Sequence, residues 1–407
     1  MLALSAPHRT TIPTRRRPHH AVPHPQPAQI NRSRPRRGHH GGSRRVLLIG
    51  LRRQRCHHTS DLLRRVVGDN RSVRAVRPTV HRGLRPGGRA GERQRGINGR
   101  PVALKYEDSQ SDPKQSVTVA QKFVADKDVI LAFGDYSSAA SIPASPIYTS
   151  GRLLQYGFNN SNPAFTQKGT EYQWSTAITT SANYQWTADY IKSQGVSSVA
   201  VTYLNTADWG IPAYQAFKAE AEKVGLTITD AEGVLDSSDD YRPSLTKAVA
   251  GKPQAFVHIG YGPDAAKLVT QLRAIGYQGA FYGGQDEKSF DATPDAAGSI
   301  IGAQFLETSS DPRVKAFVDA FRKKYPTEQH VTSFEAHAYD ALNVAVAAAK
   351  QGGTTREGVL QGFKEVKDVP SVIYGAVTFD QATRRVQSPK LTPTILKGGT
   401  WVEYKTA

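Results

Sequence analysis

Apolar and polar positions alternate in blocks along residues 96–407. Short apolar runs such as Val129–Phe133 (VILAF) and Ala255–Gly260 (AFVHIG) have the length of a strand that is buried on both faces. Between these runs, apolar residues recur at helical spacing, for example at Leu268 and Leu272. This alternation of strands and helices predicts an α/β fold with doubly wound parallel sheets.

The same pattern predicts an order of elements. A helix is expected to begin at Asp112, because Asp is a preferred N-cap and Pro113 suits the first helical position. Strands are expected at 102–106, 129–133, 153–157, 199–204, 226–235, 255–260, 280–284 and 300–306, with shorter pieces from 372 onward. Further helices are expected at 138–150, 182–193, 211–224, 241–249, 264–275, 311–325, 333–350 and 355–366.

Two consecutive expected strands end in turns that are rich in Ser and Asn, within 134–163. Ser137 and Ser138 follow the first strand, and Asn159–Pro163 follow the second. Ligands of open parallel sheets bind in the crevice at the carboxyl ends of the strands. The first turn also opens a helix, whose free N–H groups and dipole favour an anion. The pattern fits a carboxylate site and simple helix capping by the two serines equally well.

The net charge of +18 would by itself suggest nucleic acid or an acidic surface as a partner. However, residues 1–100 contain 24 Arg, no Lys and three acidic residues, whereas residues 101–407 carry 29 basic and 32 acidic side chains. The basic excess therefore belongs to the first quarter of the chain. We expect no nucleic-acid partner for the remainder.

Residues 1–95 form an atypical segment rich in Arg, His and Pro, without a single Phe, Tyr or Trp. Three interpretations remain open: an Arg-rich arm that binds nucleic acid, a natural disordered extension, and an out-of-frame translation that joins the true frame near Gly96. The use of Arg without Lys favours the third, because a solvated basic tail is served equally well by either residue.

Targeting and metal signals are weak. Cys56 is the only cysteine, so no disulfide is expected, and the His pairs of the first quarter lack partners at metal-ligand spacing. The apolar run Val46–Leu51 (VLLIGL) is shorter than the core of a signal peptide. No apolar span of 18 residues occurs, so no membrane-crossing helix is expected.

No catalytic motif emerges from the sequence: GxSxG, Walker, GxGxxG and HExxH patterns are all absent. The three histidines outside the first quarter are His258, His330 and His337, and a structural role is expected for each. We therefore expect a protein that is not an enzyme and needs neither a cofactor nor a metal.

Several short motifs together resemble the periplasmic branched-chain amino-acid-binding proteins, the ligand-capturing subunits of ABC importers. The resemblance rests on the order and spacing of the motifs over some 300 residues. They are Gly96–Arg100 (GINGR), Tyr106–Pro113 (YEDSQSDP), the Ser-rich stretch at 134–163, Asn205–Gly210 (NTADWG), Gly260–Pro263 (GYGP), Ala338–Ala341 (AYDA), Thr378–Asp380 (TFD) and Lys397–Val402 (KGGTWV).

The resemblance implies two doubly wound α/β lobes, joined by three crossovers, with a ligand cleft between them (the type I periplasmic-binding fold). Lobe 1 would comprise 96–177 and 307–388, and lobe 2 would comprise 178–306 and 389–407. The family's first strand should precede Gly96, yet nothing upstream resembles it. If residues 1–95 are out of frame, we therefore expect lobe 1 to lack an internal strand.

The resemblance also implies the ligand contacts. The ligand carboxylate would meet Ser138, Ala139, Asn159 and Ser161 of lobe 1. Trp209 would close over the ligand, Tyr261 would contact it, and Asp286 would pair with its ammonium group, with Gln285 as the other register. Asn159 and Trp209 replace the residues usual in the family, which leaves amides, urea-like molecules and aromatic acids open as ligands.

The expected function is capture of a small amino-acid-like solute and its delivery to an ABC transporter permease. The expected compartment is the periplasm or another extracytoplasmic space, with membrane contact only through the permease or a lipid anchor. A ligand-sensing domain of the same fold is the alternative. It would need a fused membrane helix or DNA-binding unit, and neither is visible.

Overall fold

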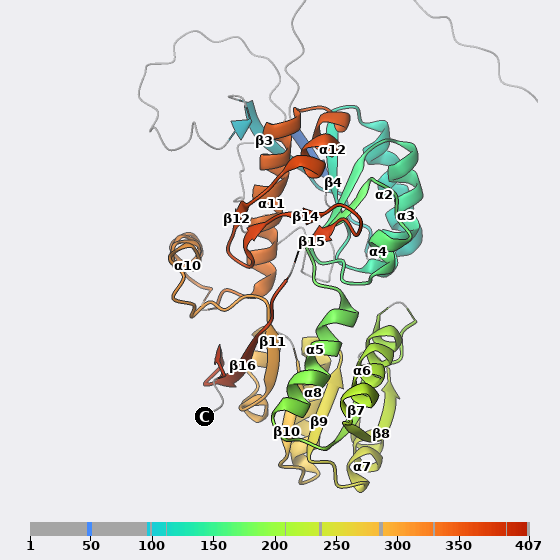
Figure 1. The fold of residues 1–407 in the computed structure, drawn as a ribbon, viewed down its shortest axis with the longest axis vertical. Helices are drawn as coiled ribbons and strands as arrows, with labels where there is room; N and C mark the ends of the chain where they lie inside the picture. The colour runs from blue at the N-terminus through green and yellow to red at the C-terminus, as the bar shows by residue number, and fades with distance from the viewer. Residues whose placement is uncertain are drawn as a thin grey trace, which may run out of the picture. The chain divides into compact units, whose positions relative to one another are not determined.

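The strands of the protein form two large sheets, each covered by helices on both faces (Figure 1). The computed structural model describes residues 47–50, 96–97, 100–110, 112–207, 209–235, 238–284, 288–328, 330–387 and 389–404. All of these belong to one compact unit, Arg45–Ala407. The α/β fold class expected from the sequence is confirmed.

The first sheet has eight strands in the order β14-β15-β6-β5-β4-β1-β3-β2. Its central strands pair in parallel, whereas β2 and β14 pair antiparallel to their neighbours. The bounds are β1 Leu47–Gly50, β2 Gly96–Ile97, β3 Arg100–Lys105, β4 Val129–Phe133, β5 Leu154–Gly157, β6 Gln173–Ser175, β14 Phe379–Asp380 and β15 Arg385–Val386.

Two pairs of helices cover this sheet. One face packs on α2 (Pro113–Ala125) and α3 (Ser138–Ser150), and the other on α11 (Ser333–Gly352) and α12 (Arg356–Glu365). The short helix α4 (Ala164–Gln167) precedes β6. Every residue of β4 is buried, which explains why that strand is an uninterrupted apolar run.

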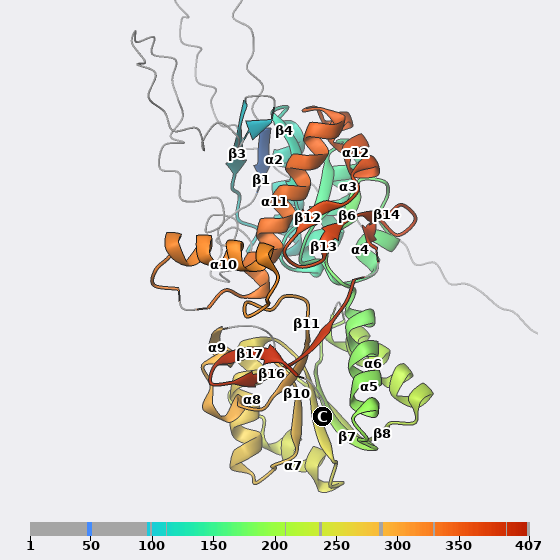
Figure 2. The same cartoon turned by 60° about the vertical axis from the view of Figure 1, so that its left-hand side comes forward.

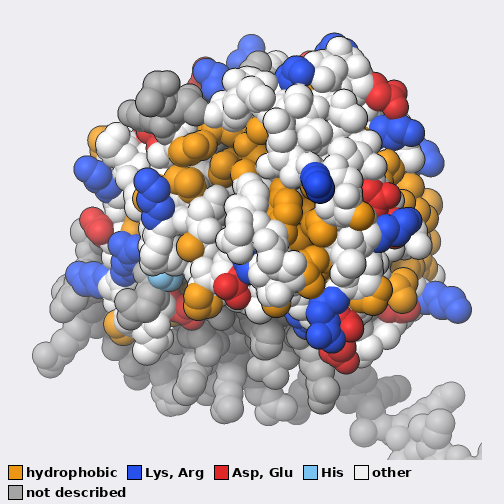
Figure 3. All heavy atoms as spheres, turned by 90° about the horizontal axis from the view of Figure 1, so that it is seen from below, with side chains coloured by type: hydrophobic (Ala, Val, Ile, Leu, Met, Phe, Trp, Pro, Cys, Tyr) orange, Lys and Arg blue, Asp and Glu red, His pale blue; other side chains and the backbone are white. Residues whose placement is uncertain are grey.

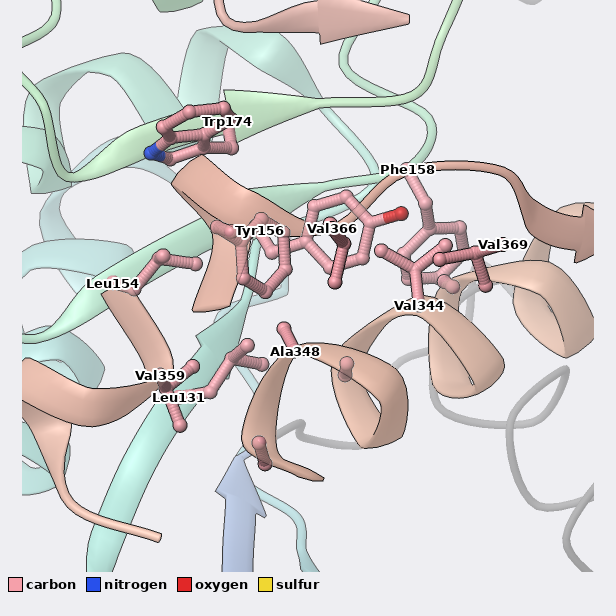
Figure 4. Close-up of a cluster of buried hydrophobic side chains, with 14 of the residues drawn as sticks. Leu131, Leu154, Tyr156, Phe158, Trp174, Val344, Ala348, Val359, Val366 and Val369 are labelled. Atoms are coloured by element: carbon pink, nitrogen blue, oxygen red, sulfur yellow. The ribbon is translucent and has the colours of Figure 1, made fainter. Parts of the chain in front are cut away.

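The core between this sheet and its C-terminal helices is rich in aromatic rings. Tyr156 and Trp174 come from β5 and β6, and small residues such as Ala348 on α11 leave room for them (Figure 4). Tyr156 and Phe363 meet edge to face at 4.9 Å between ring centroids, a geometry that aromatic quadrupoles favour.

A strand from the atypical N-terminal segment completes the first sheet. β1 lies between β3 and β4 and pairs in parallel with both, with Leu47 opposite Val102 and Leu48 opposite Val129. The expectation that lobe 1 lacks an internal strand is therefore wrong. The apolar run at 46–51, judged only by the length that a signal peptide requires, has the length of a buried strand. The rest of the expectation for residues 1–95 lies outside the described residues.

The second sheet has seven strands in the order β17-β16-β11-β10-β9-β7-β8. Strands β7 to β11 pair in parallel, whereas β16 runs antiparallel to β11 and forms a hairpin with β17 (Figure 2). The bounds are β7 Ser198–Leu204, β8 Thr227–Val234, β9 Ala255–Ile259, β10 Ala280–Gly283, β11 Ile300–Ala303, β16 Thr392–Lys397 and β17 Thr400–Glu403.

Alternate side chains of β9 face opposite helix layers. Phe256 packs with α7 (Arg242–Ala250) and α8 (Gly262–Ala274), whereas Val257 packs with α5 (Thr180–Ser193) and α6 (Gly210–Val224). The two-residue period of a strand thus builds one core on each face of the sheet. The short helices α9 (Lys288–Asp291) and η1 (Pro294–Ala296) lead from β10 to β11.

The chain passes between the sheets after β6, after β11 and after β15, within the described residues. The second passage leads into α10 (Pro312–Lys324), and the small hairpin β12 (Val369–Ser371) and β13 (Gly375–Val377) precedes the third. Tyr374 lies between β12 and β13, and its hydroxyl donates to the carbonyl oxygen of Thr176 and lies 3.2 Å from Gln304 Oε1. Thr176 follows β6 and Gln304 follows β11, so Tyr374 connects the hairpin with the first and second passages between the sheets. The exact lobe boundaries at 177, 306 and 388 stay a prediction.

Acidic and basic side chains are interspersed on the face drawn in Figure 3, which carries no extended patch of a single sign. This agrees with the nearly balanced charge of residues 101–407. Among the described residues, no helix combines the length and the apolar character needed to span a membrane.

Candidate functional site

A cavity of about 210 Å³ is lined by residues from both sheets and from the helices that follow their strands. The first turns or N-caps of five helices contribute to it, namely α3, α5, α6, α8 and α11. Helix N-termini carry free N–H groups and a partial positive charge. No Asp, Glu, Lys or Arg occurs among the described lining residues.

The turn after β4 brings two serines to the cavity. Ser137 is the N-cap of α3, but its side chain makes no capping hydrogen bond. Ser138 Oγ lies 3.4 Å from the backbone N–H of Asn162, on the next turn of the sheet. Both serines line the cavity. Helix capping alone therefore does not account for the Ser137 hydroxyl.

Asn160 ties the two polar turns together. Its side-chain NH₂ donates to the carbonyl oxygen of Asp135 at 3.1 Å and to Ser141 Oγ at 2.9 Å. The buried amide lies so close to Gly134 and Gly157 that a Cβ there would come within 2.6 and 2.2 Å of its Oδ1. Glycine at both strand ends is thus what allows the amide to fit.

The second turn presents Asn159 and Ser161 to the cavity. Ser161 Oγ accepts a hydrogen bond from Thr180 Oγ1 at 2.9 Å, and its carbonyl oxygen accepts one from the Thr180 N–H at 2.9 Å. The turn is thereby fixed to the start of α5. The side-chain nitrogen of Asn159 is fully enclosed and has no partner among the described residues, so it is a donor available to a ligand.

Aromatic rings form the wall of the cavity on the side of the second sheet. Trp209 and Tyr261 are the N-caps of α6 and α8, and their rings stack with centroids 5.1 Å apart. Tyr184 meets Trp209 edge to face at 6.2 Å. Trp186 lies against Gly302, where a Cβ would approach the indole to 2.5 Å. All four aromatic residues line the cavity.

Two buried imidazoles also line the cavity, one from each sheet region. Burial lowers the pKa of His337 to about 4 and that of His258 to about 3, so both rings are neutral near pH 7. His258 Nδ1 lies 2.9 Å from Thr202 Oγ1, and its Nε2 has no partner among the residues that the structure describes. Neither nitrogen of His337 is paired with another described residue, and its Nδ1 is fully enclosed.

The structure places five of the eight residues expected from the sequence at this one cavity: Ser138, Asn159, Ser161, Trp209 and Tyr261. Ala139 lies on α3 next to Ser138 but is not among the lining residues. Gln285 and Asp286 lie outside the described residues, although Gly284, which precedes them, lines the cavity. A ligand role for all eight stays a prediction.

Several lining residues were not expected from the sequence, among them Thr180, Tyr184, Trp186, Gln304, Phe334 and His337. Thr180 to Trp186 fall in the first turns of α5, directly after the first passage between the sheets. A cluster of polar and aromatic residues at that point of the chain, TSANYQW, is the signal that could have indicated them.

Comparison with known proteins identifies the family of this chain. A family model described as periplasmic binding protein matches residues 88–394, which is most of the chain. The chain belongs to the periplasmic binding protein family. The match begins before Gly96 and spans strands of both sheets.

Relatives within the periplasmic binding protein family share about a quarter of their residues with this chain. A Leu/Ile/Val-binding protein homolog 1 of Brucella abortus is 27% identical over 296 residues, covering 70% of this chain and 77% of that protein. The Leu/Ile/Val-binding protein BraC3 of Rhizobium johnstonii is 25% identical over 292 residues, covering 70% and 78%. The resemblance to branched-chain amino-acid-binding proteins is thereby confirmed.

Solved structures of periplasmic binding proteins show the same fold. The substrate-binding protein LivJ of Streptococcus pneumoniae, in complex with isoleucine, superposes with a TM-score of 0.73 at 19% identity, covering 88% of this chain and 100% of that one. An ABC transporter substrate-binding protein of Desulfitobacterium hafniense, in complex with Leu, gives a TM-score of 0.67 at 22% identity, covering 77% and 91%. The type I periplasmic-binding fold is confirmed.

The family consists of solute-binding proteins rather than enzymes. Among the described residues, no group of three or more His, Cys, Asp or Glu side chains could hold a metal ion. The lining residues instead offer hydroxyls, side-chain amides such as the enclosed amide of Asn159, aromatic rings and helix N-termini, which are groups that bind a small polar molecule.

Proposed function

We propose that this protein captures a small amino-acid-like ligand between its two lobes and delivers it to an ABC importer. The observation that carries the proposal is the cavity itself, because residues from both sheets line it and helix N-termini point their N–H groups toward it. The relatives named as Leu/Ile/Val-binding proteins support an amino acid as ligand.

The ligand carboxylate binds at the turns of the first sheet. Ser138 and Ser161 supply hydroxyl donors, and Asn159 supplies an amide nitrogen that has no partner in the described part of the chain. The N-terminus of α3 adds the positive end of a helix dipole. Hydrogen bonds to a charged group are roughly twice as strong as neutral ones, so this set suits an anion.

The ligand ammonium group pairs with Asp286, or with Gln285 in the other register, both of which lie outside the described residues. Trp209 and Tyr261 cover the apolar part of the ligand. Because these groups belong to different lobes, one ligand bridges them. A ligand that contacts both lobes binds the closed state more tightly than the open one, and that difference drives closure.

The proposed activity takes place in the periplasm or another extracytoplasmic space, with an ABC transporter permease as partner, and membership of the periplasmic binding protein family supports this. The aromatic wall of Tyr184, Trp186, Trp209 and Tyr261 supports aromatic acids as a second ligand class.

Titration calorimetry of the full chain against amino acids, amides and aromatic acids tests the proposal. At least one amino acid should bind, and Ser138→Ala or Ser161→Ala should weaken its binding by roughly tenfold, because each removes a hydrogen bond to a charged group. Ser150→Ala is the matched control, since Ser150 ends the same helix as Ser138 and bonds only to the carbonyl oxygen of Pro146. Binding of amides or aromatic acids alone would contradict the amino-acid assignment.

A further inference from the structure

The end of the cavity beside Tyr374 holds hydrogen-bond donors that the protein itself does not use. His337 is only 5% exposed and lines the cavity from α11. Gln304 lines it from the chain that leaves β11. The two residues flank Tyr374, whose ring lies 6.4 Å from the His337 ring and whose hydroxyl lies 3.2 Å from Gln304 Oε1. Gln304 precedes the second passage between the sheets, and His337 follows it.

The environment of His337 selects one tautomer of the neutral ring. Its Nδ1 is fully enclosed and has no hydrogen-bond partner within the described part of the chain. A buried N–H without a partner is rarer in folded proteins than a buried acceptor without one. The proton therefore resides on Nε2, which makes that nitrogen a donor. The burial that lowers the pKa of His337 to about 4 keeps the ring in this neutral form near pH 7.

Gln304 supplies a second donor at the same end. Its Oε1 lies 3.2 Å from the Tyr374 hydroxyl, which also donates to the carbonyl oxygen of Thr176, and its side-chain NH₂ has no partner among the described residues. His258, the other buried imidazole, does not belong to this group. Its Nε2 lies against Gly260, where a Cβ would come within 2.1 Å, so backbone rather than cavity occupies that side of the ring.

We propose that the ligand carries, besides its α-amino and α-carboxylate groups, a neutral oxygen acceptor in its side chain, which accepts hydrogen bonds from His337 Nε2 and the Gln304 amide. This rests on the proposed capture of an amino acid. The ligand class is then an amino acid with a side-chain hydroxyl or carboxamide, in contrast to the aliphatic residues in the names of the relatives.

Two alternatives fit the site less well. An aliphatic side chain would bury both donors without a partner, and an unpaired buried donor carries the full cost of its desolvation. A second carboxylate would lie among neutral rings and amides, since no Lys or Arg is found among the described lining residues. An unpaired buried anion is more costly still.

Pairs of amino acids with nearly the same shape isolate this contact. Threonine and valine differ by a hydroxyl in place of a methyl group, and asparagine and leucine differ by a carboxamide in place of an isopropyl group. Titration calorimetry of the full chain should give threonine and asparagine a dissociation constant roughly tenfold or more below that of their apolar counterparts. A preference for valine and leucine, or equal binding, would overturn the inference.

Variants assign the preference to His337. His337→Leu should reduce the ratio of the association constants for asparagine and leucine toward one. His337→Gln should retain it, because the amide nitrogen of Gln can take the place of Nε2. The ratio is measured within each variant, so a change in the folded fraction does not affect it. Gln304→Leu should lower the same ratio independently, and an unchanged ratio in both Leu variants would contradict the assignment.

His330→Gln is the control, because His330 bonds to Glu307 at 2.9 Å and does not line the cavity. The ratio should not change in this variant. Failure of every amino acid to bind the unaltered chain would contradict the proposed function, and this inference with it. Binding of other amino acids but of none of these four would contradict this inference alone. Binding of valine and leucine as tight as, or tighter than, that of threonine and asparagine would also overturn this inference alone.

Discussion

Arg385 Nη2 donates a hydrogen bond to the carbonyl oxygen of Asn162 at 2.9 Å. The same guanidinium reaches the carbonyl oxygens of Asn160 at 3.2 Å and of Ala177 at 2.9 Å. Burial lowers the pKa of Arg385 to about 10, which still leaves it charged at neutral pH. A charge on β15 thus holds both ends of the turn that carries Ser161.

Replacement of Arg385 by Met should weaken ligand binding without removing any expected ligand contact. The carbonyl oxygens of Asn160 and Asn162 would lose their donor, and the turn would no longer hold Ser161 in place. A buried carbonyl oxygen left without its donor costs about 1–3 kcal/mol of stability. We expect a lower melting temperature. Titration calorimetry, corrected for the fraction of unfolded protein, should show a dissociation constant raised by at least roughly tenfold.

Arg384→Met is the control for Arg385. Arg384 also donates to backbone carbonyl oxygens, those of Gln173 and Gly169, but makes no bond to the turn around Ser161. Its loss should lower stability and leave the affinity of the folded protein unchanged. Equal effects of the two variants on affinity would show that Arg385 acts only through overall stability.

Trp209→Ala should weaken ligand binding and leave the fold intact. The indole stacks on Tyr261 at the cavity and is only partly buried, so its loss removes a wall of the site rather than a core residue. Tyr214 is a matched aromatic residue on the same helix region, stacked on Tyr203 at 4.3 Å, and is not among the described lining residues. Titration of both variants should show a loss of affinity for Trp209→Ala alone.

Asp286→Ala should nearly abolish amino-acid binding. Loss of one partner from a buried charge pair costs about 3–5 kcal/mol, which is roughly two to three and a half decades in the dissociation constant. Glu287→Ala, one residue further along, should have little effect. If the Asp286 variant binds amino acids normally, the ammonium group meets Gln285, or the ligand has none.

Acidification should destabilise the protein between about pH 6.5 and pH 4. The pKa of His337 falls to about 4 and that of His258 to about 3 in the fold, from 6.5, because burial disfavours the charged ring. Their contribution to stability is full above pH 6.5 and is lost as the pH falls. For His337 alone this amounts to ~3 kcal/mol.

Asp340 opposes this trend. Burial raises its pKa from 3.8 to about 6, so its contribution is greatest in acid and declines as the pH rises toward 6. The stability that the two histidines lose on acidification exceeds the stability that Asp340 gains. The melting temperature should therefore fall as the pH is lowered. Replacement of His337 by Gln should flatten the curve measured by scanning calorimetry. A melting temperature that is constant from pH 7 to pH 4 would contradict this account.

A chain shortened to 45–407 should keep its stability, whereas a chain shortened to 96–407 should lose much of it. The second lacks β1 and leaves the facing edges of β3 and β4 without hydrogen-bond partners. In domains of 150–250 residues each kcal/mol lost lowers the melting temperature by roughly 2–4 °C. Equal melting temperatures of the two shortened chains would show that β1 contributes nothing.

Sequence reasoning succeeded where the local pattern alone determines the element. Strand β4 and helix α3 match their expected bounds, because a fully buried strand is an apolar run and the helix begins at a serine N-cap. Strand β6 (QWS) was missed, since two of its three residues are polar. Gln173 and Ser175 are nevertheless buried, and hydrogen bonds to Thr170 and Arg385 satisfy them.

Tertiary contacts decided the rest. The pairing of β1 with strands far along the chain leaves no trace in its own four residues beyond their apolar character. At the site, the Ser and Asn turns could be expected because both follow strands of one parallel sheet. His337 could not be expected, because the sequence pattern of a long helix indicates only that this histidine lies on a packed face. Its place at the cavity depends on residues from other parts of the chain.

The position of β1 also bears on the order in which the protein is made. β1 leaves the ribosome before every other described strand, yet its two partners begin at Arg100 and Val129. At roughly 5–20 residues per second, synthesis reaches them several seconds later. During that interval the apolar segment of β1 is exposed to solvent, because its partner strands have not yet been synthesised. A binding factor that shields this segment until Phe133 has emerged should therefore raise the yield of folded protein.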